Sequence, residues 1–347
     1  MARRAREPDP WGLASAREEK FMPMGAFTKS LALLVGNELG VFECLSEGPR
    51  SLDEIVGRLK TDPKGTRILL DALVALRYLA KSDGFYENEP DAERYLTRGS
   101  PEYMGTRLRH SYRGLARWLR LEDMVRKGQK HKRNLEEFRE TAAQRRRREK
   151  SFALGLNESS RATAARLSEL LDLDGVGEML DIGGGAGTYS ITFANKWPKL
   201  KPTIFELPVP ARVARQQVKK AGVDGRVRVK AGDFLKDDLG RENYDAAFMS
   251  NIIHIYGPGD NLKLIRKAHR ALKSGGRIFL KDMLVNDGRD APFYPVMFAL
   301  TMLMFTDEGD AYSRSQVIGW LREAGFTRIR HKVVIPHESS MLIGHKK

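Results

Sequence analysis

A glycine-rich stretch holds the first residues whose types and spacing suggest chemistry. The run LDIGGGAGT, residues 180–188, places Gly183, Gly185 and Gly187 at alternate positions after Asp181. Glycine has no Cβ, so its backbone can turn tightly and approach a ligand closely, and a following helix offers free N–H groups. Dinucleotide-binding enzymes use a related loop, and a purely structural turn has the same composition. The loop alone therefore predicts a ligand site without naming the ligand.

Two acidic residues recur at the ends of the next predicted strands. Glu206 ends the run PTIFE, 23 residues beyond Gly183, where a carboxylate can accept hydrogen bonds from ribose hydroxyls. Asp233 follows the run VRVKAG and precedes Phe234, a pair suited to the amino group and ring of adenine. Ligands of α/β proteins bind at the carboxyl edge of the sheet. Together with the glycine loop, these residues predict an adenosyl pocket.

The elements that must position this pocket alternate between short apolar runs and amphipathic stretches. From residue 177 onward the predicted strands are EMLDI, PTIFEL, VRVKA, YDAAFMS, GRIFLKDML and RHKVVIP. Strands separated by helical segments indicate βαβ units and a mostly parallel sheet. The fold class predicted for this half is α/β and Rossmann-like.

The first half of the chain is predicted to be mainly helical. Apolar residues at helical spacing run from Phe27 to Leu45. Helix starts are marked by a Ser51–Glu54 capping box and by Asp62-Pro63. A helix over 68–79 and a hairpin over 78–88 follow, with a turn at Asp83-Gly84. This outline is that of a winged helix, which serves either to bind DNA or to pack against protein.

The length of 347 residues favours more than one domain. We expect a winged-helix domain over 1–105, a helical connector over 106–165 and a ligand-binding domain over 166–347. The longest apolar run, 296–305, is about half of a membrane-spanning helix, and the single cysteine, Cys44, fits a reducing compartment. No secretory signal, membrane segment or metal site is expected, and the predicted location is the cytoplasm.

The net charge of +15 is concentrated in one segment. Residues 107–150 hold 16 Lys/Arg against 6 Asp/Glu and include Arg145–Arg148. Because Glu136, Glu137 and Glu140 are interspersed, a solvated helix face is the simpler interpretation. A DNA-binding regulator would need a basic recognition helix, and residues 68–79 hold only Arg77 against Asp71.

The sequence resembles a known family. The glycine loop, Glu206, Gly232–Phe234, Ser250–His254 and the runs LKSGGRIFL and LREAGF are similar to class I S-adenosylmethionine-dependent methyltransferases. More narrowly, they resemble the small-molecule O-methyltransferases related to caffeate, acetylserotonin and hydroxyneurosporene methyltransferases. The likeness extends to ELGVFECL, SLDEIVGRL and ILLDALVALRYL in the first half.

The resemblance implies roles for several residues. The N-terminal domain is implied to form a homodimer, and S-adenosylmethionine is implied as the methyl donor, with S-adenosylhomocysteine as product. The glycine loop is expected to hold the methionine end, Glu206 the ribose, and Asp233 with Phe234 the adenine. Asp181 and Ser250 are expected to complete this cofactor site.

The same family places its general base at His254. A neutral imidazole is a suitable base for a hydroxyl that attacks the methyl group, although a buried core histidine is the simpler alternative. The family triplet His-Asp-Trp is His254-Ile255-Tyr256 here. Of the two acidic residues that orient the base in the family, one corresponds to Asp282, and Ala311 occupies the position of the other.

An apolar stretch is expected to line the acceptor pocket. It includes Met297, Phe298, Met302, Met304 and Phe305, although such a stripe is also typical of plain core. Phe152 resembles a family aromatic residue near the methyl group.

The predicted acceptor is a small molecule, most simply the hydroxyl of an aromatic, polyketide or isoprenoid compound. The partly replaced base machinery leaves methylation of carbon or nitrogen open. A nucleic-acid methyltransferase is disfavoured because 250–253 lack the Asn/Asp-Pro-Pro-aromatic pattern.

Overall fold

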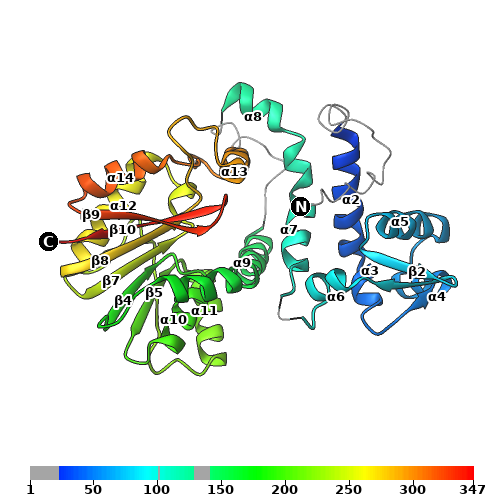
Figure 1. Ribbon diagram of the computed structural model, residues 1–347, viewed down its shortest axis with the longest axis horizontal. Coiled ribbons are helices and arrows are strands. Elements are labelled where there is room, and N and C mark those ends of the chain that lie inside the picture. The colour runs from blue at the N-terminus through cyan, green and yellow to red at the C-terminus, as the bar shows by residue number, and fades with distance from the viewer. Residues whose placement is uncertain (1–22, 101, 129–140) are drawn as a thin grey trace, which may run out of the picture. The chain divides into compact units, whose positions relative to one another are not determined.

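The computed structural model describes residues 23–100, 102–128 and 141–347 (Figure 1). The chain divides into two compact units, Met1–Leu115 and Ala116–Lys347, so the segment expected as a connector is shared between them. Within the described residues, no helix is long and apolar enough to cross a membrane.

The first unit consists of short helices and a small sheet. Its elements are α2 (Pro23–Leu39), α3 (Val41–Cys44), β1 (Arg50–Ser51), α4 (Leu52–Leu59), α5 (Pro63–Ala75), β2 (Leu79–Ser82), β3 (Phe85–Asn88) and α6 (Pro90–Leu96). Helix α7 (Gly105–Trp118) spans the boundary. The Ser51–Glu54 capping box is confirmed, and the Asp62 side chain accepts the N–H of Gly65 at 2.7 Å.

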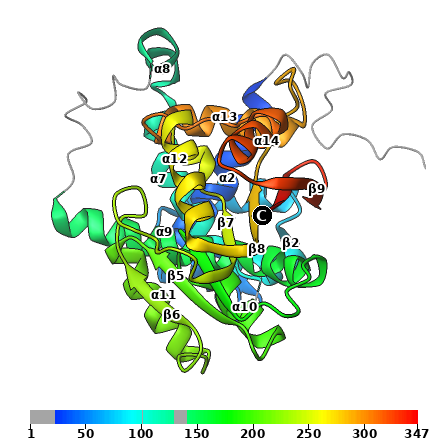
Figure 2. The ribbon, with the colours of Figure 1, turned by 90° about the vertical axis from the view of Figure 1, so that its left-hand side faces the viewer.

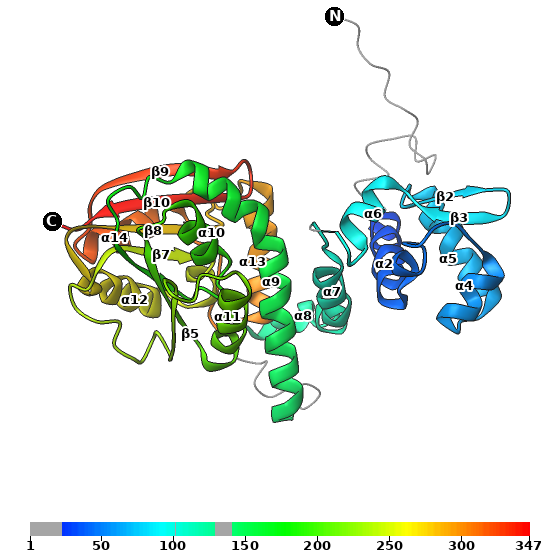
Figure 3. The same cartoon turned by 90° about the horizontal axis from the view of Figure 1, so that it is seen from below.

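Two predicted helices of this unit were too long. The expected run to Leu45 breaks at Gly40, whose φ of 85° is left-handed. The helix expected to reach Leu79 ends at Ala75, because Arg77 turns with φ 59° and Leu79 pairs with Asn88 in the hairpin. The predicted hairpin is confirmed. It packs beside α5 over a core that includes Phe42, Ile55, Leu70, Leu73 and Tyr86 (Figure 3).

The second unit is an α/β domain with a seven-stranded sheet. Its helices are α8 (Leu121–Lys127), α9 (Ala142–Leu170), α10 (Thr188–Lys196), α11 (Pro208–Lys220), η3 (Ile253–Ile255), α12 (Pro258–Ala271), α13 (Phe293–Phe305) and α14 (Arg314–Glu323). Its strands are β4 (Glu178–Ile182), β5 (Lys201–Glu206), β6 (Arg228–Ala231), β7 (Tyr244–Ser250), β8 (Leu272–Asp282), β9 (Thr327–Ile335) and β10 (Ser339–His345).

The strand order β6-β5-β4-β7-β8-β10-β9 confirms the mostly parallel sheet. The five strands from β6 to β8 pair in parallel, whereas β10 is antiparallel to both β8 and β9. Strand β10 was not predicted, although its sequence SSMLIGH is short and apolar.

Helices cover both faces of this sheet, which explains why its central strands are almost continuously apolar. On one face, α9 and α10 pack against alternate residues such as Met179 and Phe248, and α11 lies beside α10 (Figure 3). On the other face, α12 and α14 pack against Leu180 and Ile278 (Figure 2). Because β4, β5, β7 and β8 are parallel, the loops that follow them converge on one edge of the sheet.

At the opposite, amino-terminal edge of the sheet, Asp245 links strands through hydrogen bonds. Its Oδ2 accepts the N–H groups of Gly177 at 3.0 Å and Glu178 at 2.8 Å, and its Oδ1 accepts Lys273 Nζ at 2.8 Å. Burial raises the pKa of Asp245, but these three donors outweigh it and lower the pKa below its usual value. One carboxylate thus links the starts of β4, β7 and β8.

We expect Asp245→Asn to lower the free energy of unfolding by about 1–2 kcal/mol at pH 7, since charge-assisted hydrogen bonds are weakened. A lowered pKa stabilises the fold fully above the unfolded-state value of about 4, and this stabilisation is lost as the pH falls through the lower folded-state value. The deficit should therefore hold from pH 7 to about 5 and shrink between about pH 4 and 2. Thermal melts of both proteins between about pH 7 and 2 measure this, with the exposed Asp224→Asn as control. A deficit that stays constant with pH would contradict a role of the charge.

Candidate active site

The glycine loop connects β4 to α10 at the carboxyl edge of the sheet. Gly183, Gly185 and Gly187 have φ values of 69°, 58° and 87°, a region that only glycine adopts readily. A Cβ on Gly183 would lie 2.2 Å from Cδ1 of Ile252, so a larger residue there would have to displace that side chain. A Cβ on Gly185 would meet nothing within 4 Å, so this side of the loop faces open space, as a cradle for a ligand requires.

Asp181 lies beneath the loop. It is 1% exposed, and its Oδ2 accepts the Ser190 hydroxyl at 2.6 Å. The same oxygen lies 2.6 Å from the position of a Cβ on Gly184. Burial raises the pKa of Asp181 to about 7, the Ser190 bond opposes this, and the Glu206 charge adds to it. Within the described residues, Asp181 therefore supports the loop from below.

Glu206 ends β5 and bonds directly to the loop. Its Oε2 accepts the N–H of Gly185 at 2.8 Å, and its Oε1 accepts the N–H of Leu207 at 2.6 Å. Burial raises the pKa of Glu206, and these two bonds oppose the effect. A carboxylate held this way has further lone pairs for hydroxyl donors.

Asp233 and Phe234 follow β6. Burial raises the pKa of Asp233, but the N–H of Leu235 at 3.0 Å and the Lys236 ammonium lower it below its usual value. Phe234 is buried, and its ring meets Tyr256 edge-on at 5.9 Å. An ionised carboxylate and an aromatic ring therefore lie together at this strand end.

Ser250 ends β7, and its buried Oγ has no hydrogen-bond partner among the described residues. A buried hydroxyl without a partner costs free energy unless a ligand or water satisfies it. With the open side of Gly185 and the lone pairs of Glu206, this fits an adenosyl ligand that carries several polar groups.

His254 and Asp282 form a buried pair at the ends of β7 and β8. His254 lies in η3, is 7% exposed, and its Nδ1 is 2.6 Å from Asp282 Oδ1. Burial raises the pKa of Asp282, but the charge and hydrogen bond of His254, the N–H of Met283 and the charge of Lys281 together lower it below its usual value. An ionised Asp282 accepts the proton on Nδ1, which leaves the lone pair of the imidazole on Nε2.

Hydrogen bonds to its backbone carbonyls fix the turn that holds His254. The fully buried Asn261 donates to the carbonyls of Ile253 at 2.8 Å and Tyr256 at 2.9 Å. The N–H of Asp310 donates to the carbonyl of His254 at 3.0 Å. A Cβ on Gly309 would lie 2.2 Å from that carbonyl oxygen. Sequence reasoning missed Asn261, although a polar residue at helical spacing from the buried Leu264 and Ile265 is a usable signal.

The second acidic partner expected from the family is absent from the described residues around His254. Ala311 is fully buried at the corresponding position. The neighbouring Asp310 carboxylate instead pairs with Arg289 at 2.7 Å. The imidazole is thus oriented by one carboxylate.

Helix α13 supplies the apolar surface beside this pair. The ring of Phe298 meets the imidazole of His254 edge-on, with centroids 4.9 Å apart. Met302 is buried, whereas Met297 is 45% exposed. The ring of Phe305 meets Trp118 at 5.8 Å. The side chain of Phe152 lies outside the described residues.

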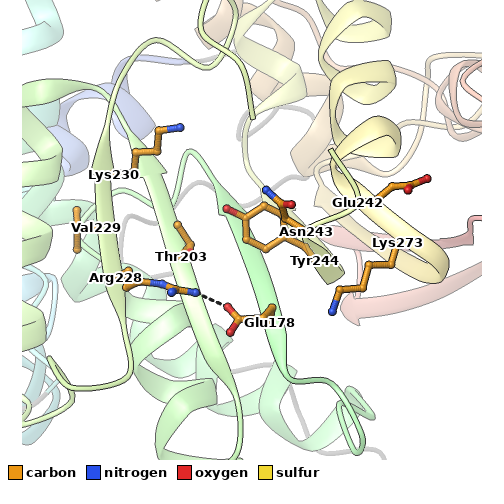
Figure 4. A pocket seen from close by; sticks show the side chains of 9 residues that line it. All are labelled: Glu178, Thr203, Arg228, Val229, Lys230, Glu242, Asn243, Tyr244 and Lys273. Carbon is orange, nitrogen blue, oxygen red and sulfur yellow. Dashed lines mark hydrogen bonds and ion pairs between the residues drawn. The ribbon is translucent and has the colours of Figure 1, made fainter. Parts of the chain in front are cut away.

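A groove of about 600 Å³ lies at the other edge of the sheet (Figure 4). Its lining includes Glu178, Arg228 and Tyr244, the first residues of β4, β6 and β7. Arg228 pairs with Glu178 within it. Ligands of parallel sheets bind at the carboxyl edge, so we assign the site to the edge that holds His254.

Comparison with known proteins identifies both units. Residues 23–98 match the model of the O-methyltransferase dimerisation domain, and residues 118–327 match that of the O-methyltransferase domain. The chain is 33% identical over 303 residues to 3-hydroxy-5-methyl-1-naphthoate 3-O-methyltransferase of Streptomyces sahachiroi, covering 87% of each chain. It is 29% identical to the N,N-dimethyltransferase OxyT of Streptomyces rimosus, covering 88% of this chain and 89% of the relative.

The fold is similar to a solved structure over nearly its whole length. The crystal structure of human N-acetylserotonin methyltransferase in complex with SAM superposes with a TM-score of 0.85 at 26% identity, covering 96% of this chain and 98% of that one. Family models match residues in both units, and one relative is above 30% identity. The chain belongs to the O-methyltransferase family.

Proposed function

We propose that this enzyme transfers a methyl group from S-adenosylmethionine to the hydroxyl of an aromatic small molecule, with His254 as the general base. The observation that carries the proposal is the 2.6 Å contact between His254 Nδ1 and Asp282 Oδ1 at the carboxyl edge that also holds the glycine loop. Relatives named as naphthoate and acetylserotonin O-methyltransferases support an aromatic acceptor.

Four strand ends would hold the methyl donor. The loop with Gly183, Gly185 and Gly187 accommodates its methionine end, Glu206 accepts its ribose hydroxyls, and Asp233 with Phe234 contacts its adenine, while Ser250 offers a hydroxyl. S-adenosylmethionine supplies an electrophilic methyl group on a sulfonium ion.

His254 removes the acceptor's proton. Its Nε2 accepts the hydroxyl proton as the acceptor oxygen attacks the methyl group of the donor. The ionised Asp282 stabilises the imidazolium that forms. Phe298 and the buried Met302 exclude water from the same space, and alignment of the two reactants lowers the barrier further.

Methylation of nitrogen is a second candidate. The relative OxyT is named an N,N-dimethyltransferase, and Ala311 leaves His254 with one carboxylate partner among the described residues. An amine that is already nucleophilic at neutral pH needs little help from a base. The two candidates therefore differ in their dependence on His254.

Replacement of the base separates these candidates. We expect His254→Ala to leave S-adenosylhomocysteine affinity intact and to reduce turnover of a phenolic acceptor by about 10²–10⁴-fold. Asp282→Asn should act in the same direction, because the imidazole loses its orienting charge. Turnover should be measured on 3-hydroxynaphthoates, polyketide phenols and acetylserotonin, with the exposed His331→Ala as control.

The pH dependence provides a second readout. Wild-type turnover should rise with pH, because only a neutral imidazole accepts the proton. A His254→Ala enzyme that keeps most of its turnover on the preferred acceptor, with a flat pH profile, would exclude the base role and favour an amine acceptor.

Glu206 should be required for cofactor binding. Glu206→Ala is expected to weaken the binding of S-adenosylhomocysteine by about 1–3 kcal/mol, since charge-assisted hydrogen bonds to the ribose are lost. Titration calorimetry measures the change, with Glu178→Ala at the opposite edge as control. Equal affinities of wild type and Glu206→Ala would remove Glu206 from the site.

The full chain should be a homodimer formed mainly through its first unit. Large apolar side chains there are exposed, including Phe27 at 50%, Ile68 at 52% and Phe85 at 47%, and exposed apolar surface of this kind marks interfaces. Light scattering at micromolar concentration should give twice the chain mass of 39.2 kDa. A single species at the chain mass would contradict the homodimer.

A further inference from the structure

Lys281 is a buried cation that the mechanism above does not use. It is 3% exposed, and among the described residues it is the only lysine or arginine in the buried class. Its Nζ donates to the neutral amide oxygen of Asn251 at 2.8 Å. No carboxylate of the described residues lies within ion-pairing distance of this ammonium. Its hydrogen-bond partner is neutral, and the Asp282 carboxylate acts on this charge only from beyond ion-pairing distance. A buried ammonium without a directly paired anion is costly and favours the binding of one.

The surroundings of Lys281 belong to the ligand edge. Lys281 is paired in register with Ser250 on the adjacent parallel strand, so both side chains lie on the same face of the sheet. The Ser250 hydroxyl is the buried group without a partner described above. Two polar groups that are incompletely satisfied are therefore neighbours at the ends of β7 and β8.

The turn after β7 connects Lys281 to the glycine loop. Asn251 adopts φ 59°, and its N–H donates to the carbonyl of Lys281 at 3.0 Å, so backbone and side chain of these residues bond reciprocally. The next residue, Ile252, packs so closely on Gly183 that a Cβ there would lie 2.2 Å from its Cδ1. The ammonium thus lies beside the turn that contacts the methionine end of the proposed cofactor site.

The charges of the proposed cofactor site and of S-adenosylmethionine are complementary. The cradle contributes the carboxyl groups of Asp181, Glu206 and Asp233, which suit a ligand with cationic and hydroxyl groups. S-adenosylmethionine has a sulfonium and an ammonium group, and its single anionic group is the carboxylate of its methionine moiety. Only Lys281 offers a buried positive charge to that carboxylate among the described residues.

We propose that Lys281, held by Asn251 and beside the Ser250 hydroxyl, binds the carboxylate of the methyl donor and so makes the enzyme selective for donors that retain it. The inference rests on the proposed cofactor site and adds a residue to it. A buried salt bridge to the ligand that is also hydrogen-bonded contributes more to binding affinity than an exposed ion pair does.

The test compares S-adenosylmethionine with decarboxylated S-adenosylmethionine, which lacks only this carboxylate. Titration calorimetry on the wild type should show at least about 10-fold tighter binding of the intact donor. In Lys281→Met, affinity for the intact donor should fall by about 10- to 100-fold, while affinity for the decarboxylated donor stays within about two-fold. Lys281→Arg should retain part of the discrimination.

Lys273→Met is the matched control, because Lys273 lies on the same strand at the opposite edge and pairs with Asp245. It should leave both affinities unchanged. Equal binding of the two donors by the wild type would overturn the inference even if Lys281→Met did not fold. The inference would also be overturned if Lys281→Met kept the full preference for the intact donor over the decarboxylated one. The same holds if the only effect of Lys281→Met were on the KM of the acceptor. A wild type that binds neither donor would instead overturn the cofactor site itself.

Discussion

The close approach of the glycine loop to two buried carboxyl groups is the constraint on which the ligand edge depends. Asp181 supports the loop from beneath, and Glu206 accepts a loop N–H from the neighbouring strand. Any side chain at Gly184 would collide with the Asp181 carboxyl group. Burial raises the pKa of both acids. The parallel register of β4 with β5 brings the two acids together.

The catalytic pair depends on a different pairing in the same sheet. Because β7 and β8 are parallel neighbours, the turn after one strand carries His254 to the last residue of the other, Asp282. Asn261 from α12 and the backbone of 309–310 hold this turn from outside. Orientation of the imidazole is thus shared among three segments that are distant in sequence.

Local patterns predicted much of this structure because they report on local physics. The glycine frame, the strand-terminal acids and the Ser51–Glu54 capping box each follow from short-range geometry, and so does the run that became β7. The sequence did not reveal that 339–345 returns antiparallel to β8, since that pairing joins residues about sixty positions apart. Nor did it indicate that Asp310 pairs with Arg289, or that Lys281 is buried. Lysine in a strand normally predicts a solvent-facing position, whereas the last residues of β8, Lys281 among them, are continuously buried.

Gly309 limits which substitutions are compatible with the position of His254. The segment between α13 and α14 contacts the turn of His254, and variation in such loop segments is a common route to new binding preferences. At residue 309 a methyl group would collide with the carbonyl oxygens of His254 and Ile255 and with Thr306 Oγ1. Any larger residue at position 309 would therefore displace the backbone that holds His254, whereas Met297 of α13 is 45% exposed. A combinatorial library aimed at new acceptors can randomise the outer face of α13, but it must keep residue 309 unchanged to preserve the placement of the base.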